Sequence, residues 1–143
     1  NTKAIHKNPA DSGTHNWNGI TIAIAEDETY NLYLLTRILK KLKVEIISFK
    51  NGKEIVGFFQ DSSHQKVDLI LMDIQMPGMD GYTATRHIRK IEPNIHIIAQ
   101  TAYAMVEDVN KIKSSPFDDY ISKPIRPGIL IEKVGKLLYP EHV

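Results

Sequence analysis

The sequence feature that most constrains the fold is an alternation of short, β-branched apolar runs with longer amphipathic ones. The short runs are Ile20–Ala25, Val44–Ser48, Val67–Met72, Ile95–Ala99 and Tyr120–Ser122. The longer runs are Asn31–Leu42, Lys53–Gln60, Gly81–Lys90, Ala104–Lys113 and Arg126–Leu138. Five strands that alternate with five helices predict an α/β fold, in which a doubly wound parallel sheet is covered by helices on both faces and the crossovers are right-handed.

The composition excludes several classes of protein. The 143 residues include no cysteine, which removes disulfide frameworks, thiolate metal sites and cysteine nucleophiles. A net charge of +1 provides no broad positive field for nucleic acid. The longest uninterrupted apolar run, Ala102–Val106, is far shorter than the roughly 20 residues of a membrane helix. We therefore expect a cytoplasmic domain that itself contacts neither nucleic acid nor membrane, which leaves open a membrane-anchored parent protein.

The two ends of the chain differ from the alternating region between them. Residues 1–18 are polar and show no apolar period, so they are predicted to be a linker or disordered tail, with Trp17 as the one candidate exception. Residues 19–139 form the predicted domain, and residues 140–143 are a C-terminal tail. The polar lead suggests that further sequence lies upstream of the domain.

Polar side chains follow the carboxyl ends of four predicted strands: Glu26 with Asp27, Asp73, Thr101, and Lys123. In an open parallel sheet, ligands bind in the crevice beyond these ends. Each residue taken alone also fits a turn, a helix cap or a solvated side chain. Three carboxylates in one crevice, however, repel each other unless a cation joins them. Oxygen ligands without histidine or cysteine favour a hard cation, and Mg²⁺ fits this set best.

Four motifs at these strand ends resemble those of the bacterial response-regulator receiver domains. Residues 72–81, MDIQMPGMDG, are similar to the family loop D-x-x-M-P-x-M-D-G, and Glu26-Asp27 is similar to its acidic pair. Thr101-Ala102 matches its hydroxyl position, and residues 119–124, DYISKP, match its fifth-strand signature. The resemblance covers about residues 19–139. It implies a flavodoxin-like (βα)5 sandwich with the sheet order 2-1-3-4-5.

The resemblance also implies a chemistry for these residues. Asp73 would be the nucleophile that accepts a phosphoryl group from a phosphohistidine, which gives an aspartyl phosphate. Lys123 and the Thr101 hydroxyl would bind the phosphoryl oxygens. In the family the peptide bond between the lysine and proline of this motif is usually cis. The Mg²⁺ ligands that the resemblance implies are Glu26, Asp27, Asp73 and the backbone carbonyl of Gln75.

Two further roles concern the lifetime and the readout of the phosphoryl group. Gln75 and Tyr103 lie two residues beyond Asp73 and Thr101, so we expect them to flank the attacking water and to tune hydrolysis. Thr101 and Tyr120 are expected to switch the surface of the fourth helix, fifth strand and fifth helix, because a hydroxyl drawn toward the phosphoryl group vacates space for an aromatic ring.

The chain departs from the family pattern at one place, Ser115-Pro116-Phe117, where the family commonly has Ala-Gly and a small residue. A glycine can end a helix in a left-handed conformation, which proline cannot adopt, so we expect the end of the fourth helix to differ in geometry.

The function most consistent with these features is a phosphoacceptor receiver in a two-component phosphorelay. The E-D-E-x-x-N pattern that ends at Asn31 is similar to receivers of hybrid sensor histidine kinases, and we expect a C-terminal receiver of such a kinase. Its partners would be a histidine kinase dimerisation domain or a histidine phosphotransfer domain. The isolated domain would phosphorylate itself and turn over no external substrate, while the full-length parent remains a candidate histidine kinase.

Three alternatives belong to other classes. A phosphatase or phosphotransferase with an aspartate nucleophile needs a second Asp two residues later, where this chain has Gln75, and a cap domain for which there is little room. A flavin carrier needs a phosphate cradle after the first strand, where residues 26–28 are acidic and would repel the phosphate. A docking module that is never phosphorylated would not require the set of Asp27, Asp73, Thr101 and Lys123.

Overall fold

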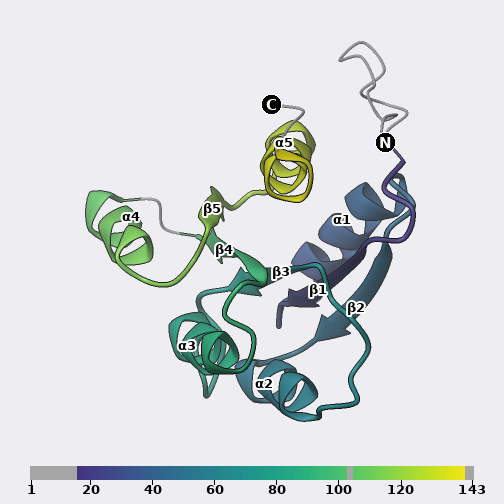
Figure 1. Cartoon of the computed structure of the whole chain (residues 1–143). Helices are drawn as coiled ribbons and strands as arrows, with labels where there is room; N and C mark the ends of the chain where they lie inside the picture. Colours follow the sequence, from purple (N-terminus) through teal and green to yellow (C-terminus); the bar gives the residue numbers. More distant parts are fainter. Residues whose placement is uncertain (1–15, 103–104, 141–143) are drawn as a thin grey trace.

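A computed structural model describes residues 16–102 and 105–140 and contains a five-stranded parallel sheet between two layers of helices (Figure 1). The strands are β1 (Thr21–Ala25), β2 (Glu45–Phe49), β3 (Leu69–Asp73), β4 (His96–Thr101) and β5 (Asp119–Ser122). The helices are α1 (Thr29–Lys40), α2 (Gly52–Gln60), α3 (Gly81–Ile91), α4 (Val106–Lys113) and α5 (Pro127–Leu138). The strand order is β2-β1-β3-β4-β5, which confirms the predicted fold class and topology.

Strand β4 extends two residues beyond the apolar run that predicted it. Gln100 and Thr101 are polar, yet both are buried and continue the ladder, in which Asp73 pairs with Gln100 and Thr101 pairs with Ser122. The end of an apolar run therefore underestimates this strand, because polar residues that are buried at the carboxyl edge of the sheet continue it. Helix α1 likewise begins two residues earlier than the expected Asn31.

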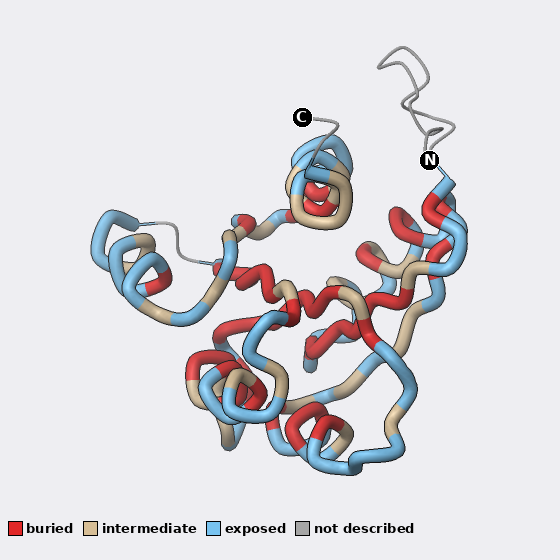
Figure 2. The backbone as a smooth tube through the Cα atoms, in the orientation of Figure 1, coloured by how far each residue is buried: buried red, intermediate tan, exposed pale blue. Residues whose placement is uncertain are grey.

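The core has one compartment on each face of the sheet, because successive strand residues point to opposite faces. Ile22 and Ile24 of β1 pack on the side of α1 and α5, whereas Ala23 and Ala25 pack on the side of α2 and α3. Figure 2 shows the central strands as a continuous buried layer between the helices. The sheet is thus a rigid platform, and its carboxyl edge is where polar groups can be held in fixed positions.

Trp17 belongs to the core, as its apolar side chain suggests. It is 5% exposed, its backbone N–H donates to the carbonyl of Leu42 at 2.7 Å, and its ring lies 6.2 Å from that of Tyr139. This residue ties the start of the described chain to the ends of α1 and α5.

Helix α4 ends without a left-handed residue, in agreement with the departure noted at Ser115-Pro116-Phe117. Its last flanking residue, Ser114, is right-handed with φ −88°. The Phe117 ring packs against the Tyr82 ring of α3, with centroids 5.8 Å apart. Packing of Phe117 against α3 thus fixes the residues after α4, where other members of the family often have a glycine that ends the helix.

Arg89, near the end of α3, connects that segment to the rest of the fold. Its guanidinium donates to the carbonyl of Pro116 and to the carboxylate of Asp118, both at 2.9 Å, and also to the carbonyls of Pro93 and Ile95. The same Asp118 oxygen accepts the N–H of Ile97 at 2.7 Å. One partly buried arginine therefore joins α3, the residues just before β4 and the loop before β5.

Candidate functional site

Three carboxylates meet at the carboxyl edge of the sheet. Glu26 follows β1 directly, Asp27 is the next residue, and Asp73 is the last residue of β3. One oxygen of each lies within 4.8 Å of the others. Glu26 and Asp73 are 1% and 3% exposed, whereas Asp27 is exposed. The cluster therefore has a buried floor and one carboxylate that faces solvent.

The ammonium of Lys123 lies against the two buried carboxylates. Its Nζ is 3.2 Å from Glu26 Oε1 and 3.2 Å from Asp73 Oδ2. The peptide bond between Lys123 and Pro124 is cis, as the resemblance implies, and the Lys123 N–H donates to the carbonyl of Thr101 at 2.8 Å. Since Lys123 follows β5 and Asp73 ends β3, the lysine side chain reaches across β4.

The structure places most of the other predicted residues around the same point. Thr101 is buried at the end of β4. Gln75 is exposed, and its backbone N–H donates to Asp73 Oδ1 at 3.1 Å. Tyr103 lies outside the described residues, so its predicted role has no structural counterpart here.

The loop after β3 is held against Asp73 by the start of α3. Asp80 caps this helix by accepting the N–H of Thr83 at 2.8 Å, and the N–H of Gly81 donates to the carbonyl of Ile74 at 2.8 Å. A Cβ on Gly81 would collide with the backbone carbonyl of Asp73. Glycine is thus required by close packing behind Asp73, which agrees with a role for Gly81 in backbone geometry.

Burial and mutual repulsion perturb the charged groups of this cluster. Burial, and then the charge of Asp73, raises the pKa of Glu26 from 4.5 to about 7. Burial also raises the pKa of Asp73, although the Lys123 ammonium opposes this. For Lys123, burial lowers the pKa, but the carboxylates of Asp73 and Glu26 outweigh it and raise the pKa above its usual value. The site thus holds more acid than one ammonium can neutralise.

These groups fit a hard divalent cation. Within the described residues, Glu26, Asp27 and Asp73 are the one group of three acidic or histidine side chains close enough to share an ion. Carboxylate oxygens suit Mg²⁺, which keeps several waters and needs only one or two protein carboxylates together with a phosphate oxygen. A cation would also relieve the repulsion that raises the pKa of Glu26.

Tyr120 lies on the other side of β5 from the core of α1 and α5. It packs beside Ala99 of β4 and Ile112 of α4, whereas the next residue, Ile121, packs on the side of α1 and α5. Tyr120 pairs with Ala99 in the ladder, two positions before the pair of Thr101 and Ser122. The aromatic ring and the hydroxyl therefore lie on neighbouring strands, as the sequence predicts.

Two side chains near these residues were not predicted. Gln100 is fully buried next to Asp73 in the ladder, and its amide atoms have no hydrogen-bond partner among the described residues. A polar residue that follows an apolar strand run directly was the available signal. The second is Lys133 of α5, whose ammonium lies over the Tyr120 ring. Nothing in its spacing indicates this contact.

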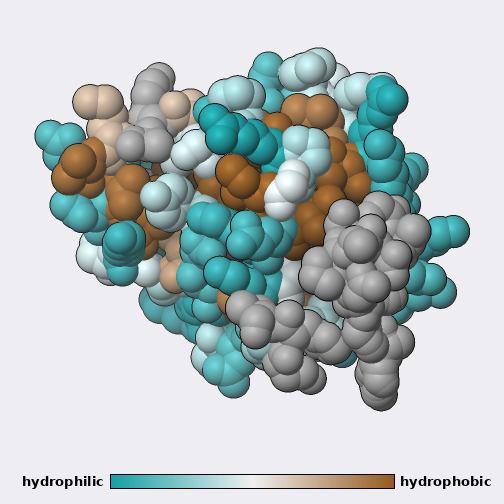
Figure 3. All heavy atoms as spheres, turned by 90° about the horizontal axis from the view of Figure 1, so that it is seen from above, coloured by the Kyte–Doolittle hydropathy of each residue, from teal (hydrophilic) through white to brown (hydrophobic). Residues whose placement is uncertain are grey.

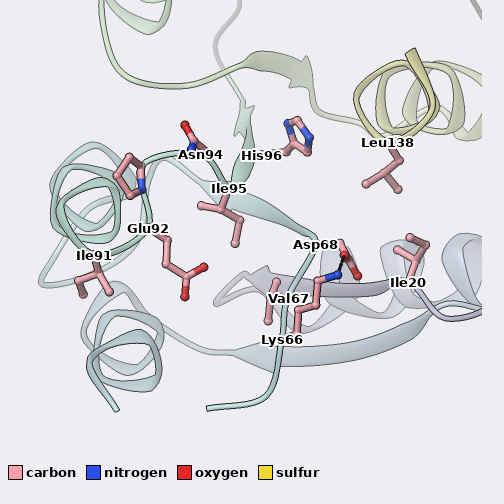
Figure 4. Close-up of a pocket in the computed structure, with 11 residues that line it drawn as sticks. Ile20, Lys66, Val67, Asp68, Ile91, Glu92, Asn94, Ile95, His96 and Leu138 are labelled. Atoms are coloured by element: carbon pink, nitrogen blue, oxygen red, sulfur yellow. Dashed lines mark ion pairs between the residues drawn. The ribbon is translucent and has the colours of Figure 1, made fainter. Parts of the chain in front are cut away.

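A hollow of about 640 Å³ lies at the opposite edge of the sheet (Figure 4). It is lined mainly by residues that precede or begin β3 and β4, among them Asp68 and His96, together with Ile20 and Leu138. The ion pair drawn there joins Lys66 to Asp68 at 3.4 Å. The acidic cluster lies beyond the other ends of these strands. The hollow is therefore separate from the cluster.

Comparison with known proteins decides the family. The model of the response regulator receiver domain matches residues 22–135. The chain belongs to this family. It is 43% identical over 120 residues to hybrid signal transduction histidine kinase I of Dictyostelium discoideum, covering 80% of this chain and 7% of that kinase. The receiver thus spans only a small fraction of this relative.

Solved receiver domains have the same architecture. The receiver domain of sensor histidine kinase PA1611 from Pseudomonas aeruginosa, with magnesium coordinated in its active-site cleft, matches with a TM-score of 0.76 and 30% identity, covering 84% of this chain and 98% of that one. The receiver domain of Ssk1, solved with the histidine phosphotransfer protein Ypd1 of Saccharomyces cerevisiae, matches at 0.76 and 28%, covering 87% and 92%. No helix in the described part of this receiver is long and apolar enough to cross a membrane.

Proposed function

We propose that this receiver is the phosphoacceptor of a phosphorelay and that Asp73 takes a phosphoryl group from a phosphohistidine. The observation that carries the proposal is the position of the partly buried Lys123 ammonium, 3.2 Å from Asp73 and from Glu26, in a cluster that also contains the exposed carboxylate of Asp27. Phosphoryl transfer needs a positioned nucleophile with cationic groups around the transferred oxygens. This receiver provides the nucleophile and the ammonium, together with carboxylates that suit a metal.

The transfer itself requires few protein groups. An Asp73 carboxylate oxygen attacks phosphorus, a P–O bond forms as the P–N bond to histidine breaks, and the imidazole leaves with the electron pair. Lys123 turns toward the phosphoryl oxygens, and the Thr101 hydroxyl donates to one of them. Glu26, Asp27, Asp73 and the carbonyl of Gln75 would hold Mg²⁺, which would supply positive charge to balance those oxygens. Gln75 and Tyr103 then set the rate at which water removes the phosphoryl group.

The proposed readout is a change of the surface formed by α4, β5 and α5. When Thr101 is drawn to the phosphoryl group, the ring of Tyr120 turns into the space that the hydroxyl leaves. The support is the position of both residues on neighbouring strands, with Tyr120 partly buried against α4. Two discrete ring positions give the receiver two surfaces that a partner can distinguish.

The proposed context is a hybrid histidine kinase in the cytoplasm, with residues 19–139 and the packed Trp17 as its receiver and the polar residues before Trp17 as a linker. The relative from Dictyostelium discoideum supports this origin, and the complex of Ypd1 with the Ssk1 receiver supports a histidine phosphotransfer domain as a partner. A histidine kinase dimerisation domain is the other proposed phosphodonor.

The test is labelling with a small-molecule phosphodonor, followed by intact mass spectrometry. With Mg²⁺ the wild type should gain one phosphoryl group, and with a chelator it should gain none. Asp73→Asn should gain none under either condition, whereas Asp61→Asn, which changes an exposed carboxylate after α2, should behave as the wild type does. Equal labelling of Asp73→Asn and the wild type would refute the assignment.

A further inference from the structure

The ammonium of Lys133 makes three contacts beside β5, the last strand of the sheet. Its Nζ donates to the backbone carbonyl of Tyr120 at 2.6 Å and to Asp119 Oδ1 at 3.1 Å, and it lies 4.6 Å from the centroid of the Tyr120 ring. Strand β5 is the last strand in the sheet, so its outer backbone groups have no neighbouring strand. Lys133 thus partners a carbonyl that the sheet leaves open.

Two of these contacts are independent of the tyrosine side chain. The Tyr120 carbonyl belongs to the backbone of β5. The backbone N–H of Tyr120 donates to Asp119 Oδ1 at 2.7 Å, the same oxygen that Lys133 contacts. Rotation of the ring about χ1 leaves both groups in place, and the ammonium stays with them. The cation–π contact alone depends on the position of the ring.

We propose that Lys133 is a positioning residue that holds the Tyr120 ring beside its ammonium, at the outer side of β5, and thereby opposes the phosphorylated state. The inference rests on the proposed function, in which the ring turns toward Thr101 when the receiver is phosphorylated. A contact present in only one of two states shifts the equilibrium toward that state. Lys133 therefore sets how much phosphoryl binding energy is needed to change the surface.

The location of Lys133 gives this role a consequence for binding. Helix α5 carries Lys133, and β5 carries Tyr120, so both belong to the face that is proposed to change. The surface in Figure 3 shows apolar side chains gathered between polar ones on the side of the molecule where α5 lies. A partner that draws the ammonium away from the ring would favour the phosphorylated arrangement, and phosphorylation would in turn favour that partner.

The test compares Lys133→Met, which keeps an unbranched apolar stem without the charge, with Lys133→Arg, which keeps a cation. Lys136→Met is the matched control, since Lys136 is an exposed lysine on the same helix. The first readout is the χ1 population and ring ¹³C shift of Tyr120 by NMR without metal or phosphoryl mimic. The second is the midpoint of a titration with beryllofluoride in the presence of Mg²⁺.

Lys133→Met should raise the population of the Tyr120 rotamer in which the ring is turned toward Thr101. It should also lower the beryllofluoride concentration at the titration midpoint about threefold, as expected for the loss of a partly exposed cation–π contact. Lys133→Arg and Lys136→Met should match the wild type. In the wild type, beryllofluoride should also shift the Lys133 Cε resonance as the ring leaves it. This last measurement needs no variant that could fail to fold.

Unchanged Tyr120 populations and midpoints in Lys133→Met would overturn the inference. A Tyr120 shift in the wild type without any shift at Lys133 would do the same. A wild type in which beryllofluoride shifts neither the loops around Asp73 nor Tyr120 would refute the proposed function instead. In that case the comparison of ring populations without mimic still tests the hold of Lys133 on the ring.

Discussion

Replacing Glu26 by glutamine should stabilise the metal-free receiver at neutral and alkaline pH. In the folded protein, burial and the charge of Asp73 raise the pKa of Glu26 from 4.5 to about 7. Between these values the folded protein retains a proton that the unfolded chain has released. The folded state therefore loses stability as the pH rises from about 4.5 to about 7, and it bears the full cost of a buried carboxylate above that range.

The size of this cost follows from the two pKa values. The interval from 4.5 to about 7, at about 1.4 kcal/mol per pH unit, corresponds to about 3 kcal/mol. A glutamine keeps the shape of the side chain without the titrating proton. The difference in unfolding free energy between Glu26→Gln and the wild type should therefore increase by about 3 kcal/mol, in favour of the variant, from pH 4.5 to pH 8.

The assay is urea unfolding followed by circular dichroism, in buffers that contain a chelator, at half-unit steps of pH. Glu132→Gln is the control, because Glu132 is an exposed glutamate on α5, and its curve should run parallel to that of the wild type. A difference between Glu26→Gln and the wild type that stays constant across the whole range would refute the reasoning. It would mean that Glu26 titrates in the folded protein as it does in the unfolded chain.

Three further predictions concern stability. Gly81→Ala should lower the free energy of unfolding by about 1–3 kcal/mol and should slow labelling at Asp73, because the new Cβ meets the Asp73 carbonyl. Unchanged stability and labelling would contradict the close packing. Gln100→Leu should raise the unfolding free energy by about 1–2 kcal/mol, since it removes buried amide atoms that have no partner among the described residues; a loss of stability would show that the amide is bonded. Arg89→Ala should lower it by about 2–3 kcal/mol, whereas Arg86→Ala, on the exposed side of α3, should change it by less than about 0.5 kcal/mol; equal effects would contradict the role of Arg89 as a connection.

The sequence predicted the parts of the fold that depend on local pattern. Apolar runs located all five strands, and the polar residues after those runs marked the edge where Glu26, Asp73 and Lys123 meet. This works because parallel strands bring their carboxyl ends to the same edge. The strand order came from the resemblance, since periodicity indicates which segments are strands but not which strands are neighbours.

The contacts that depend on tertiary structure could not be predicted in this way. Lys133 reaches Tyr120 only because α5 packs beside the last strand of the sheet, and Arg89 reaches Asp118 only because α3 ends near the loop before β5. Both contacts join segments that are distant in sequence and use long side chains whose direction no local pattern determines. The pKa of Glu26 likewise depends on burial and on the distance to Asp73, both of which are tertiary quantities.

The central claim is that Asp73 accepts the phosphoryl group, and peptide mapping after transfer tests it most directly. The receiver is incubated with Mg²⁺ and a phosphorylated histidine phosphotransfer domain, reduced with borohydride, which converts an aspartyl phosphate to homoserine, and analysed by tandem mass spectrometry. The proposal predicts homoserine at position 73, and at no other aspartate, only in the sample that received the phosphorylated donor. Homoserine at Asp27 or another position, or phosphate on a serine, threonine or histidine with an unmodified Asp73, would contradict it.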